Sequence, residues 1–319
     1  MLNLDERINF QNNKSNDLLA IGEILIDLIS TEYGEDATSN TYQRYFGGSP
    51  SNIAMNAKKL GIRSVVASAI GDDGLGDFLM KKLQSAGMNT DCIQTVHKAT
   101  SMVLLTKSQS TPIPIFYRGA DYQLIYTPKL EQYLKDSKLL HFSCWPLSRY
   151  PSRQTIERAI EMAKANNVLI CFDPNYHEML WENGEDGVSY VKSIIAKSDI
   201  LKPSEDDAER LFGSDIPERY IEKFLELGAK LVILTMGKKG AIVSNGSSVE
   251  EFPSLATEVI DTTGAGDAFW SGFYSGIIKG YTIRESLRMG FATSAYKLQF
   301  TGAVIDLPKL EVISSLYQI

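Results

Sequence analysis

Hydrophobic and polar residues alternate along the chain in two kinds of pattern. Short runs that are apolar almost throughout predict strands over residues 18–30, 64–70, 101–107, 139–143, 168–172 and 231–235. Such continuous runs are typical of strands that are buried on both faces of a mostly parallel sheet. The segments between them have helical spacing. The alternation therefore predicts an α/β fold, a doubly wound and mostly parallel sheet with helices on both faces.

Two of the predicted helices have recognisable ends. One begins at Ser49, has Pro50 in its first turn and stops at Gly61. The other begins with Thr282 and Glu285, which have the spacing of a capping box. These residues predict the start of both helices and the end of the first.

Residues 31–46 and 99–120 break this alternation. Both segments are prone to form strands, are rich in Thr, Tyr and Pro, and have no helical period. We expect them to pair as a small β-sheet that covers a bound substrate as a lid. Because the chain contains no internal repeat and no linker, we predict a single domain over residues 1–319 with this lid attached.

Composition narrows the class of protein. The chain has 319 residues, of which 44% are hydrophobic and 22% charged. It contains no apolar run near the ~18 residues that span a bilayer, and its first residues are polar, so we expect a cytoplasmic protein without a membrane partner. The net charge of −7, with no long basic cluster, makes nucleic acid a poor partner.

The cysteines and histidines do not have the spacing of metal ligands or disulfide pairs. There are three of each, widely separated: Cys92, Cys144, Cys171, His97, His141 and His177. We expect the cysteines to be buried, reduced thiols, and we expect no zinc site.

The strongest chemical signal lies at residues 259–269. Gly264, Ala265 and Gly266 are small enough for a strand to turn sharply into a helix whose first N–H groups stay free, which makes an anion site. Asp267 follows in the first helical turn. A carboxylate beside an anion hole suits phosphoryl transfer, with Asp267 deprotonating the attacking hydroxyl. The alternative is an ordinary helix start whose glycines allow close packing.

This segment, DTTGAGDAF at 261–269, resembles the C-terminal signature of the ribokinase and fructokinase (PfkB) family of carbohydrate kinases. The family's N-terminal signature is matched by GGSPSNIA at 47–54, and the similarity runs from about residue 18 to 310. The resemblance implies ATP and Mg²⁺ as reactants, a sugar bound under the lid and Asp267 as the catalytic base. It leaves open a requirement for K⁺ and a homodimer formed through the lid.

The resemblance also assigns positions to the sugar. Glycines let backbone amides approach a ligand closely, and an asparagine side chain offers both a donor and an acceptor to hydroxyls. Without the family resemblance, Gly47 and Gly48 would be interpreted as a plain turn before a helix. Asp27 would be a residue at the end of a strand, and Arg118 would be a surface charge on an edge strand. The substrate-binding positions are Asp27, Gly47, Gly48, Asn52, Arg118 and Asn175.

A third set of residues is assigned to the nucleotide. The segment 202–205 takes the place of the family's Asn-x-x-Glu motif, in which Glu205 would organise Mg²⁺ through water, although Lys202 departs from the common Asn. The segment 235–240 resembles the family's nucleotide loop and is not a Walker A sequence. The nucleotide-binding positions are Lys202, Glu205, Thr235, Gly237 and Gly240.

The acceptor sugar is indicated by weaker features. The segments 22–27 and 47–52 resemble bacterial fructokinase, which would convert fructose to fructose 6-phosphate. His177 stands where fructokinases and 2-keto-3-deoxygluconate kinases commonly have Arg, and a neutral imidazole would bind an acidic sugar poorly.

Three alternatives remain. The chain could be a 2-keto-3-deoxygluconate kinase or another PfkB sugar kinase, or a sugar-binding regulator that has lost catalysis. A dinucleotide oxidoreductase is disfavoured because the glycines at 71–76 have the wrong spacing.

Overall fold

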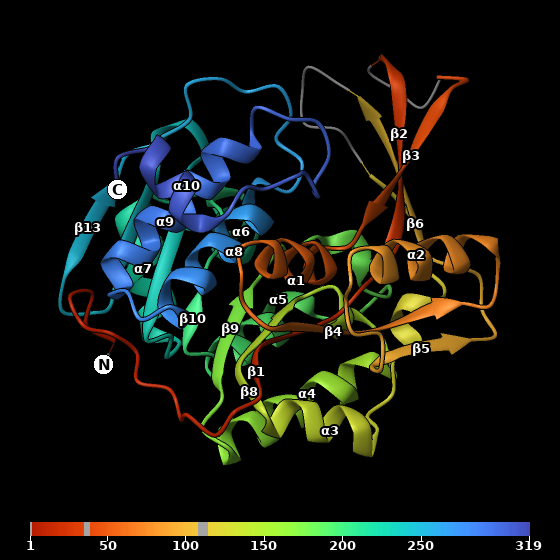
Figure 1. The fold of residues 1–319 in the computed structure, drawn as a ribbon, viewed down its shortest axis with the longest axis horizontal. Coiled ribbons are helices and arrows are strands. Elements are labelled where there is room, and N and C mark those ends of the chain that lie inside the picture. The colour runs from red at the N-terminus through yellow and green to blue at the C-terminus, as the bar shows by residue number, and fades with distance from the viewer. Residues whose placement is uncertain (1, 35–38, 108–113) are drawn as a thin grey trace.

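The computed structural model describes residues 2–34, 39–107 and 114–319, and these form one large and one small sheet (Figure 1). Within the described residues the large sheet has nine strands in the order β13-β12-β11-β10-β9-β8-β1-β4-β5. Its pairs are parallel except β11 with β12 and β12 with β13. The predicted fold class is confirmed. The strands are β1 Asn16–Ile21, β4 Ser64–Gly71, β5 Ile93–Val96, β8 Ser137–Ser143, β9 Leu169–Asp173, β10 Ile200–Leu201, β11 Leu231–Thr235, β12 Ala241–Ser244 and β13 Val249–Phe252.

Helices cover both faces of the large sheet. Leu18 of β1 packs in a cluster with residues of α1, α8 and α9, whereas the next residue, Leu19, packs in a cluster with residues of α3 to α7. Successive side chains of a strand point to opposite faces, so each face carries its own core. The helices are α1 Ser49–Lys59, α2 Gly74–Ser85, α3 Pro128–Lys135, α4 Ser152–Ala165, α5 Gly187–Ile195, α6 Glu205–Phe212, α7 Pro217–Glu226, α8 Ala265–Ile278, α9 Ile283–Lys297 and α10 Leu310–Leu316.

The strand order reverses at β1, which lies between β8 and β4. From β1 the chain continues to β4 and β5 on one side, and later strands run outward from β8 on the other side. In open α/β sheets, ligands bind outside the carboxyl ends of the strands at such a reversal. The segments that follow β1 and β8 are therefore where a site is expected.

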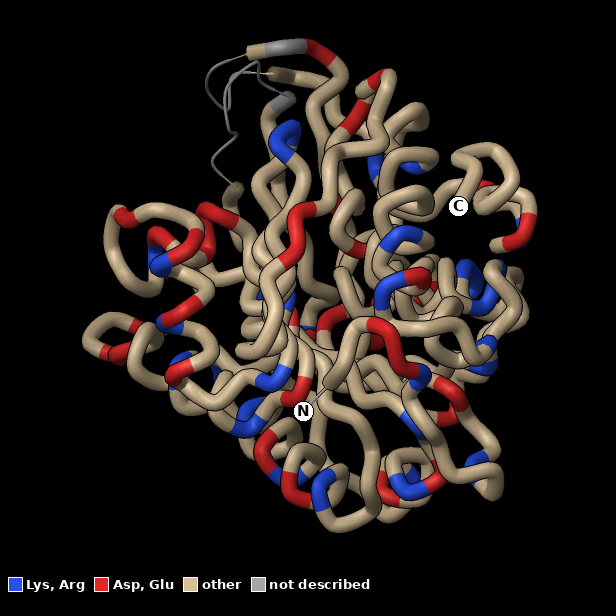
Figure 2. Tube along the Cα trace, turned by 90° about the vertical axis from the view of Figure 1, so that its left-hand side faces the viewer, with Lys and Arg blue, Asp and Glu red and all other residues tan. Residues whose placement is uncertain are grey.

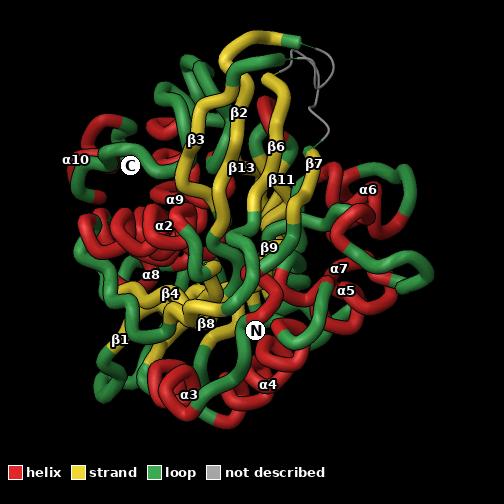
Figure 3. Tube along the Cα trace, turned by 90° about the vertical axis from the view of Figure 1, so that its right-hand side faces the viewer, coloured by secondary structure: helices red, strands yellow, loops and turns green. Residues whose placement is uncertain are grey.

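The small sheet projects from the side of the molecule where the parallel strands of the large sheet have their carboxyl ends (Figure 3). Among the described residues its order is β3-β2-β6-β7, with β2 Leu25–Tyr33, β3 Tyr42–Gly47, β6 Met102–Lys107 and β7 Ile115–Tyr117. The predicted segments 31–46 and 99–120 contain β3, β6 and β7, but residues 35–38 and 108–113 lie outside the described residues. The separate small sheet is confirmed, whereas its role as a lid and the single-domain division stay predictions.

The prediction of one strand over residues 18–30 was wrong. The chain forms β1, leaves the large sheet at 22–24 and begins β2 of the small sheet. Gly22 permits this turn because an added Cβ would lie 2.6 Å from Cγ of Pro50. Glu23 and Ile24 are as buried as the strands on either side, so no polar residue at the surface marks the break.

The predicted helix ends are confirmed. Helix α1 has Pro in its first turn and ends just before Gly61, whose φ is +96°. Thr282 and Glu285 form the capping box of α9, each side chain accepting a hydrogen bond from the other residue's backbone N–H.

Three further features of the structure relate to the composition of the chain. The three cysteines are free and buried. Along the described chain, Lys and Arg are interspersed with Asp and Glu (Figure 2). No helix among the described residues is long and apolar enough to cross a bilayer.

Candidate active site

Helix α8 begins at the glycine-rich segment for which the sequence predicts an anion site. Gly264 caps the helix at φ 73°, and an added Cβ would lie 2.5 Å from Cβ of Ala303, so only glycine fits. The Ala265 N–H donates to Thr262 O at 3.2 Å. This corrects the expectation that all the first N–H groups are free, and leaves those of Gly266 and Asp267 without a partner among the described residues.

Asp267 is buried and held by two side chains of α1. Its Oδ1 accepts a hydrogen bond from Oγ of Ser49 at 2.6 Å, and its Oδ2 accepts one from Nδ2 of Asn52 at 2.9 Å. Burial raises the pKa of Asp267 above its ordinary value, and these two hydrogen bonds oppose the rise. Ser49 was missed in the sequence, although it lies in the N-terminal signature, because only the packing of α1 against α8 brings it to the carboxylate.

Asp27 lies in β2, close to Asp267 and to the start of α1. An added Cβ on Gly47 would lie 2.3 Å from Oδ2 of Asp27, so any larger residue there would displace this carboxyl group. An added Cβ on Gly48, whose φ is +104°, would lie 2.3 Å from Glu23 O. Burial, and then the charge of Asp267, raise the pKa of Asp27 to about 7. The fold thus brings Asp27 and both glycines to Asp267.

Two polar atoms near these residues are buried without a hydrogen-bond partner among the described residues. They are Oδ1 of Asn52 and Oε2 of Glu23. The other carboxyl oxygen of Glu23 accepts from the Ser49 N–H at 3.0 Å, and burial raises the pKa of Glu23 to about 8. Buried polar groups in folded proteins are normally paired, so these two oxygens are exceptions that lie close to Ser49 and Asp267.

Arg118 is enclosed in an ion pair. Its side chain is 4% exposed, and its Nε donates to Oδ2 of Asp121 at 2.6 Å while Nη1 donates to Oγ of Ser148 at 3.0 Å. With its donors engaged in this way, Arg118 holds the base of β7, and a direct contact with substrate stays a prediction. Asn175 is exposed in the loop after β9, at φ 37°.

His177 lies at the edge of the small sheet. The centre of its ring is 5.3 Å from that of Phe116 in β7, with the two rings nearly perpendicular. Burial, and then the charge of Arg210, lower the pKa of His177, which keeps the imidazole neutral at neutral pH. This agrees with the neutral imidazole assumed from the sequence.

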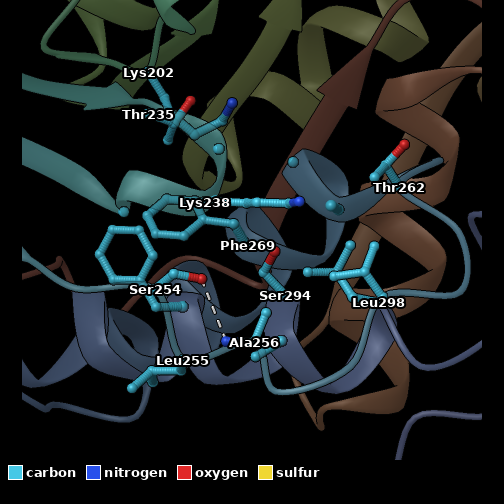
Figure 4. A pocket seen from close by; sticks show the side chains of 17 residues that line it. Lys202, Thr235, Lys238, Ser254, Leu255, Ala256, Thr262, Phe269, Ser294 and Leu298 are labelled. Carbon is cyan, nitrogen blue, oxygen red and sulfur yellow. Dashed lines mark hydrogen bonds between the residues drawn. The ribbon is translucent and has the colours of Figure 1, made fainter. Parts of the chain in front are cut away.

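A cavity of about 300 Å³ opens beside the start of α8 (Figure 4). Four of the five predicted nucleotide residues line it, namely Lys202, Thr235, Gly237 and Gly240, together with Ala265 and Gly266 of the anion site. Much of the remaining wall is apolar and comes from the loop at 254–262 and from α9. Sequence reasoning missed these residues, which include Leu255, Ala256, Phe291 and Leu298. Lys238, which lies within the predicted nucleotide loop 235–240, also lines the cavity.

Lys202 lies where this cavity meets the anion site. Its Nζ is 2.9 Å from Oδ2 of Asp173, which also accepts a hydrogen bond from Nε1 of Trp270 at 2.8 Å. A Cβ built on Gly266 would lie 3.4 Å from the same Nζ. Asp173 and Trp270 therefore hold a buried ammonium group beside the first turn of α8.

Glu205 does not line the cavity. It begins α6, is partly exposed, and its Oε1 lies 3.5 Å from Nζ of Lys239. The buried carboxylate of this segment is Asp207, which closes a capping box with Ser204 and accepts the Tyr176 N–H at 2.7 Å. The Ser-x-x-Asp spacing in the sequence could have identified Asp207. The role of Glu205 toward Mg²⁺ stays a prediction.

Comparison with known proteins shows the family of the chain. The profile of the pfkB family carbohydrate kinases matches residues 15–310. An ATP-dependent 6-phosphofructokinase of Thermoanaerobacterium thermosaccharolyticum is 57% identical over 319 residues, which are 100% of this chain and 99% of that protein.

Two solved structures are similar in fold. The fructokinase of Halothermothrix orenii superimposes with a TM-score of 0.79 at 41% identity, covering 86% of this chain and 97% of that one. A protein of E. coli described as a putative ribokinase II, in complex with ATP and Mg²⁺, superimposes with a TM-score of 0.84 at 26% identity, covering 95% of this chain and 99% of that one.

Proposed function

The chain belongs to the pfkB family of carbohydrate kinases, and from this premise we propose that its acceptor is fructose 6-phosphate. It is an ATP-dependent sugar kinase. The observation that favours fructose 6-phosphate is the identity of 57%, over essentially the full length of both chains, with an ATP-dependent 6-phosphofructokinase. Free fructose, which the sequence motifs favour, is the second candidate because a fructokinase structure is 41% identical.

In the proposed reaction Asp267 accepts the proton of the attacking hydroxyl. The hydroxyl oxygen forms a bond to the γ-phosphorus while the bond from that phosphorus to the bridging oxygen of ADP breaks. Because burial raises the pKa of Asp267, the carboxylate is a stronger base than an exposed aspartate. The hydrogen bonds from Ser49 and Asn52 orient it.

The start of α8 receives the charge on the transferred group. Gly266 and Lys202 both line the cavity, a Cβ built on Gly266 would lie 3.4 Å from the Lys202 ammonium, and the Asp267 N–H follows in the same helical turn. Donors fixed before the reaction stabilise developing charge without having to reorganise.

The cavity is the proposed ATP site. Its apolar wall, which includes Leu255, Ala256 and Phe291, suits an adenine ring, and Lys238 lines the same cavity and can pair with the phosphates. When bound, Mg²⁺ would neutralise charge on the phosphate oxygens. No group of three or more His, Cys, Asp or Glu side chains in the described chain forms a metal cage, which fits a cation held mainly by ATP phosphates, with Glu205 acting through water.

The acceptor side is supported by the carboxyl group of Asp27 and the unpaired oxygen of Asn52, which can bind sugar hydroxyls. We propose that the small sheet acts as a lid that keeps water from the γ-phosphate. A homodimer through this sheet remains a prediction. A regulator without catalysis is disfavoured because the base and the anion site are both intact.

The test is the release of ADP from Mg-ATP with fructose 6-phosphate, fructose, 2-keto-3-deoxygluconate and ribose as acceptors. We expect the highest kcat/KM with fructose 6-phosphate, and a product with a second phosphate by phosphorus NMR. A higher kcat/KM with free fructose would replace the proposed acceptor by the second candidate. If another of the sugars is best, both candidates are wrong.

A further inference from the structure

Lys297, the last residue of α9, is fully buried. Its side chain is 0% exposed, and its Nζ donates to the backbone carbonyl of Asp261 at 2.7 Å. The carboxylate of Asp261 lies 4.0 Å from the same nitrogen. Lysine is almost never fully buried unless its charge is paired, and here both acceptors belong to one residue of the loop before α8.

Asp261 joins that loop to the segment after α9. Its Oδ1 accepts the Thr263 N–H at 2.9 Å, and its Oδ2 accepts the Gly302 N–H at 2.7 Å. An added Cβ on Gly264 would lie 2.5 Å from Cβ of Ala303, so the two segments also pack tightly at the helix cap. The position of the free N–H groups of α8 therefore depends on the contacts that Asp261 makes.

Lys297 is the buried cation that contacts this loop, through Asp261. Among the described residues it is not part of the cavity wall, whereas Lys202 and Lys238 are. Burial lowers the pKa of Lys297, but Asp261 and then Asp267 act in the opposite direction and favour the charged form. Lys297 can thus influence the transferred phosphate only through the loop.

We propose that Lys297 is a positioning residue that acts as a built-in monovalent cation, fixing loop 261–264 so that phosphoryl transfer has no requirement for added K⁺. The inference rests on the proposed kinase function. A second cation bound close to the ammonium would be repelled by it in this buried environment. The oxygen atoms of Asp261 therefore do not fit a bound K⁺. The family resemblance left a requirement for K⁺ open, and by this proposal the protein has none.

The first experiment uses the unmodified protein in KCl, NaCl and tetramethylammonium chloride at equal ionic strength. We expect initial rates that agree within about twofold, and melting temperatures without a K⁺-specific increase, because a cation that binds only the folded state would raise the Tm. A rate increase of about tenfold or more with K⁺, or a K⁺-specific rise in Tm, would overturn the proposal. Absence of activity with every sugar would instead contradict the proposed function, while the Tm comparison would still test Lys297.

The second experiment removes the ammonium. Lys297→Ala should lose about 100-fold in kcat with a smaller change in the KM for ATP, as expected when preorganised donors are displaced. Ammonium or methylammonium ions should restore at least part of the lost rate and raise the Tm of this variant. Lys297→Met, which fills the space without a charge, should lose activity and show no rescue.

Lys14→Ala is the matched control. Lys14 is also buried, and its Nζ donates to two backbone carbonyls, those of Lys135 and Asn166, at 2.8 and 3.0 Å. It lies before β1, at the end of the sheet away from the site, so its loss should lower Tm with little change in kcat and without rescue by small cations. A Lys297→Met variant with the kcat of the unmodified protein would overturn the proposal. If neither Lys297 variant folds, the salt comparison on the unmodified protein decides.

Discussion

The two sides of the site differ in the groups that they present. The proposed nucleotide side, between β11, α8 and α9, offers lysine ammonium groups and free backbone N–H groups around an apolar cavity. The proposed acceptor side, between α1 and the small sheet, offers the carboxyl groups of Glu23 and Asp27 and the amide oxygen of Asn52. Asp267 lies between them.

This difference matches the triphosphate of ATP and the hydroxyl groups of the acceptor. A triphosphate carries several negative charges and only accepts hydrogen bonds, so it is bound by cations and N–H donors. The hydroxyl groups of either candidate acceptor are bound by hydrogen-bond acceptors such as these. Each of the following changes alters one side, or the residue between the sides, and each has a distinct kinetic effect.

The largest effect is expected for Asp267→Asn. The amide can keep a hydrogen bond from Ser49 but cannot take up a proton, so kcat should fall by about 10³-fold with little change in ATP affinity. Steady-state kinetics and nucleotide binding by calorimetry would measure the two quantities. Asp77→Asn is the matched control because Asp77 lies in the first turn of α2, exposed to solvent. Comparable kcat values for the two variants would show that Asp267 is not the base.

Removing charge from the nucleotide side should have the next largest effect. Lys202→Met should reduce kcat/KM by about 100-fold, because one preorganised donor to the transferred phosphate is lost. The change also leaves the carboxylate of Asp173 unpaired, which is expected to lower stability.

The double variant Lys202→Met with Asp173→Asn separates these effects. It should recover Tm relative to Lys202→Met without recovering kcat/KM. If kcat/KM returns together with Tm, the role of Lys202 is structural.

On the acceptor side, Asp27→Ala should raise the KM for the sugar by roughly 10-fold to 100-fold, as expected when hydrogen bonds to a charged group are lost. ATP affinity should not change. In the unmodified protein the sugar KM should rise as the pH falls through about 7, since protonation removes the negative charge of Asp27. A sugar KM that is the same in Asp27→Ala and the unmodified protein would exclude Asp27 from the site.

The same carboxyl group affects stability in the opposite direction. Because folding raises the pKa of Asp27 from its ordinary value of 3.8 to about 7, its contribution favours the folded state at low pH and is lost as the pH rises between these values. Asp27→Asn should therefore stabilise the free protein at pH 8, by on the order of 1 kcal/mol in unfolding free energy, and so raise its Tm. At pH 4 the same substitution should leave the Tm unchanged. Thermal melts at the two pH values check this, and equal shifts at both would contradict it.

The smallest kinetic effect is expected for a methyl group added at Gly47, which lies against the carboxylate of Asp27. Gly47→Ala places a methyl group against the carboxylate of Asp27, so we expect the sugar KM to rise by about 10-fold. Gly74→Ala is the control, because an added Cβ at Gly74 has nothing within 4 Å. If both variants retain the sugar KM of the unmodified protein, the close approach of Gly47 does not determine how Asp27 meets the substrate.

The sequence by itself determined the fold class and the helix that carries the proposed base. Runs of apolar residues predicted the buried strands near 64–70, 139–143, 168–172 and 231–235, and DTTGAGDAF contains in nine adjacent residues both the glycine cap and the carboxylate of α8. Helix ends such as Ser49 and Thr282 were predictable because capping depends on neighbours within one turn.

Only the tertiary structure decided which distant residues meet. Ser49 bonds to Asp267 across 218 positions, and the Lys297 ammonium contacts a loop 36 positions earlier in the chain. The break within 18–30 was hidden because residues on both sides of it are buried, one side in the large sheet and the other in the small one. A linear pattern records whether a residue prefers to be buried, but the partner of a buried polar group depends on how helices and sheets pack.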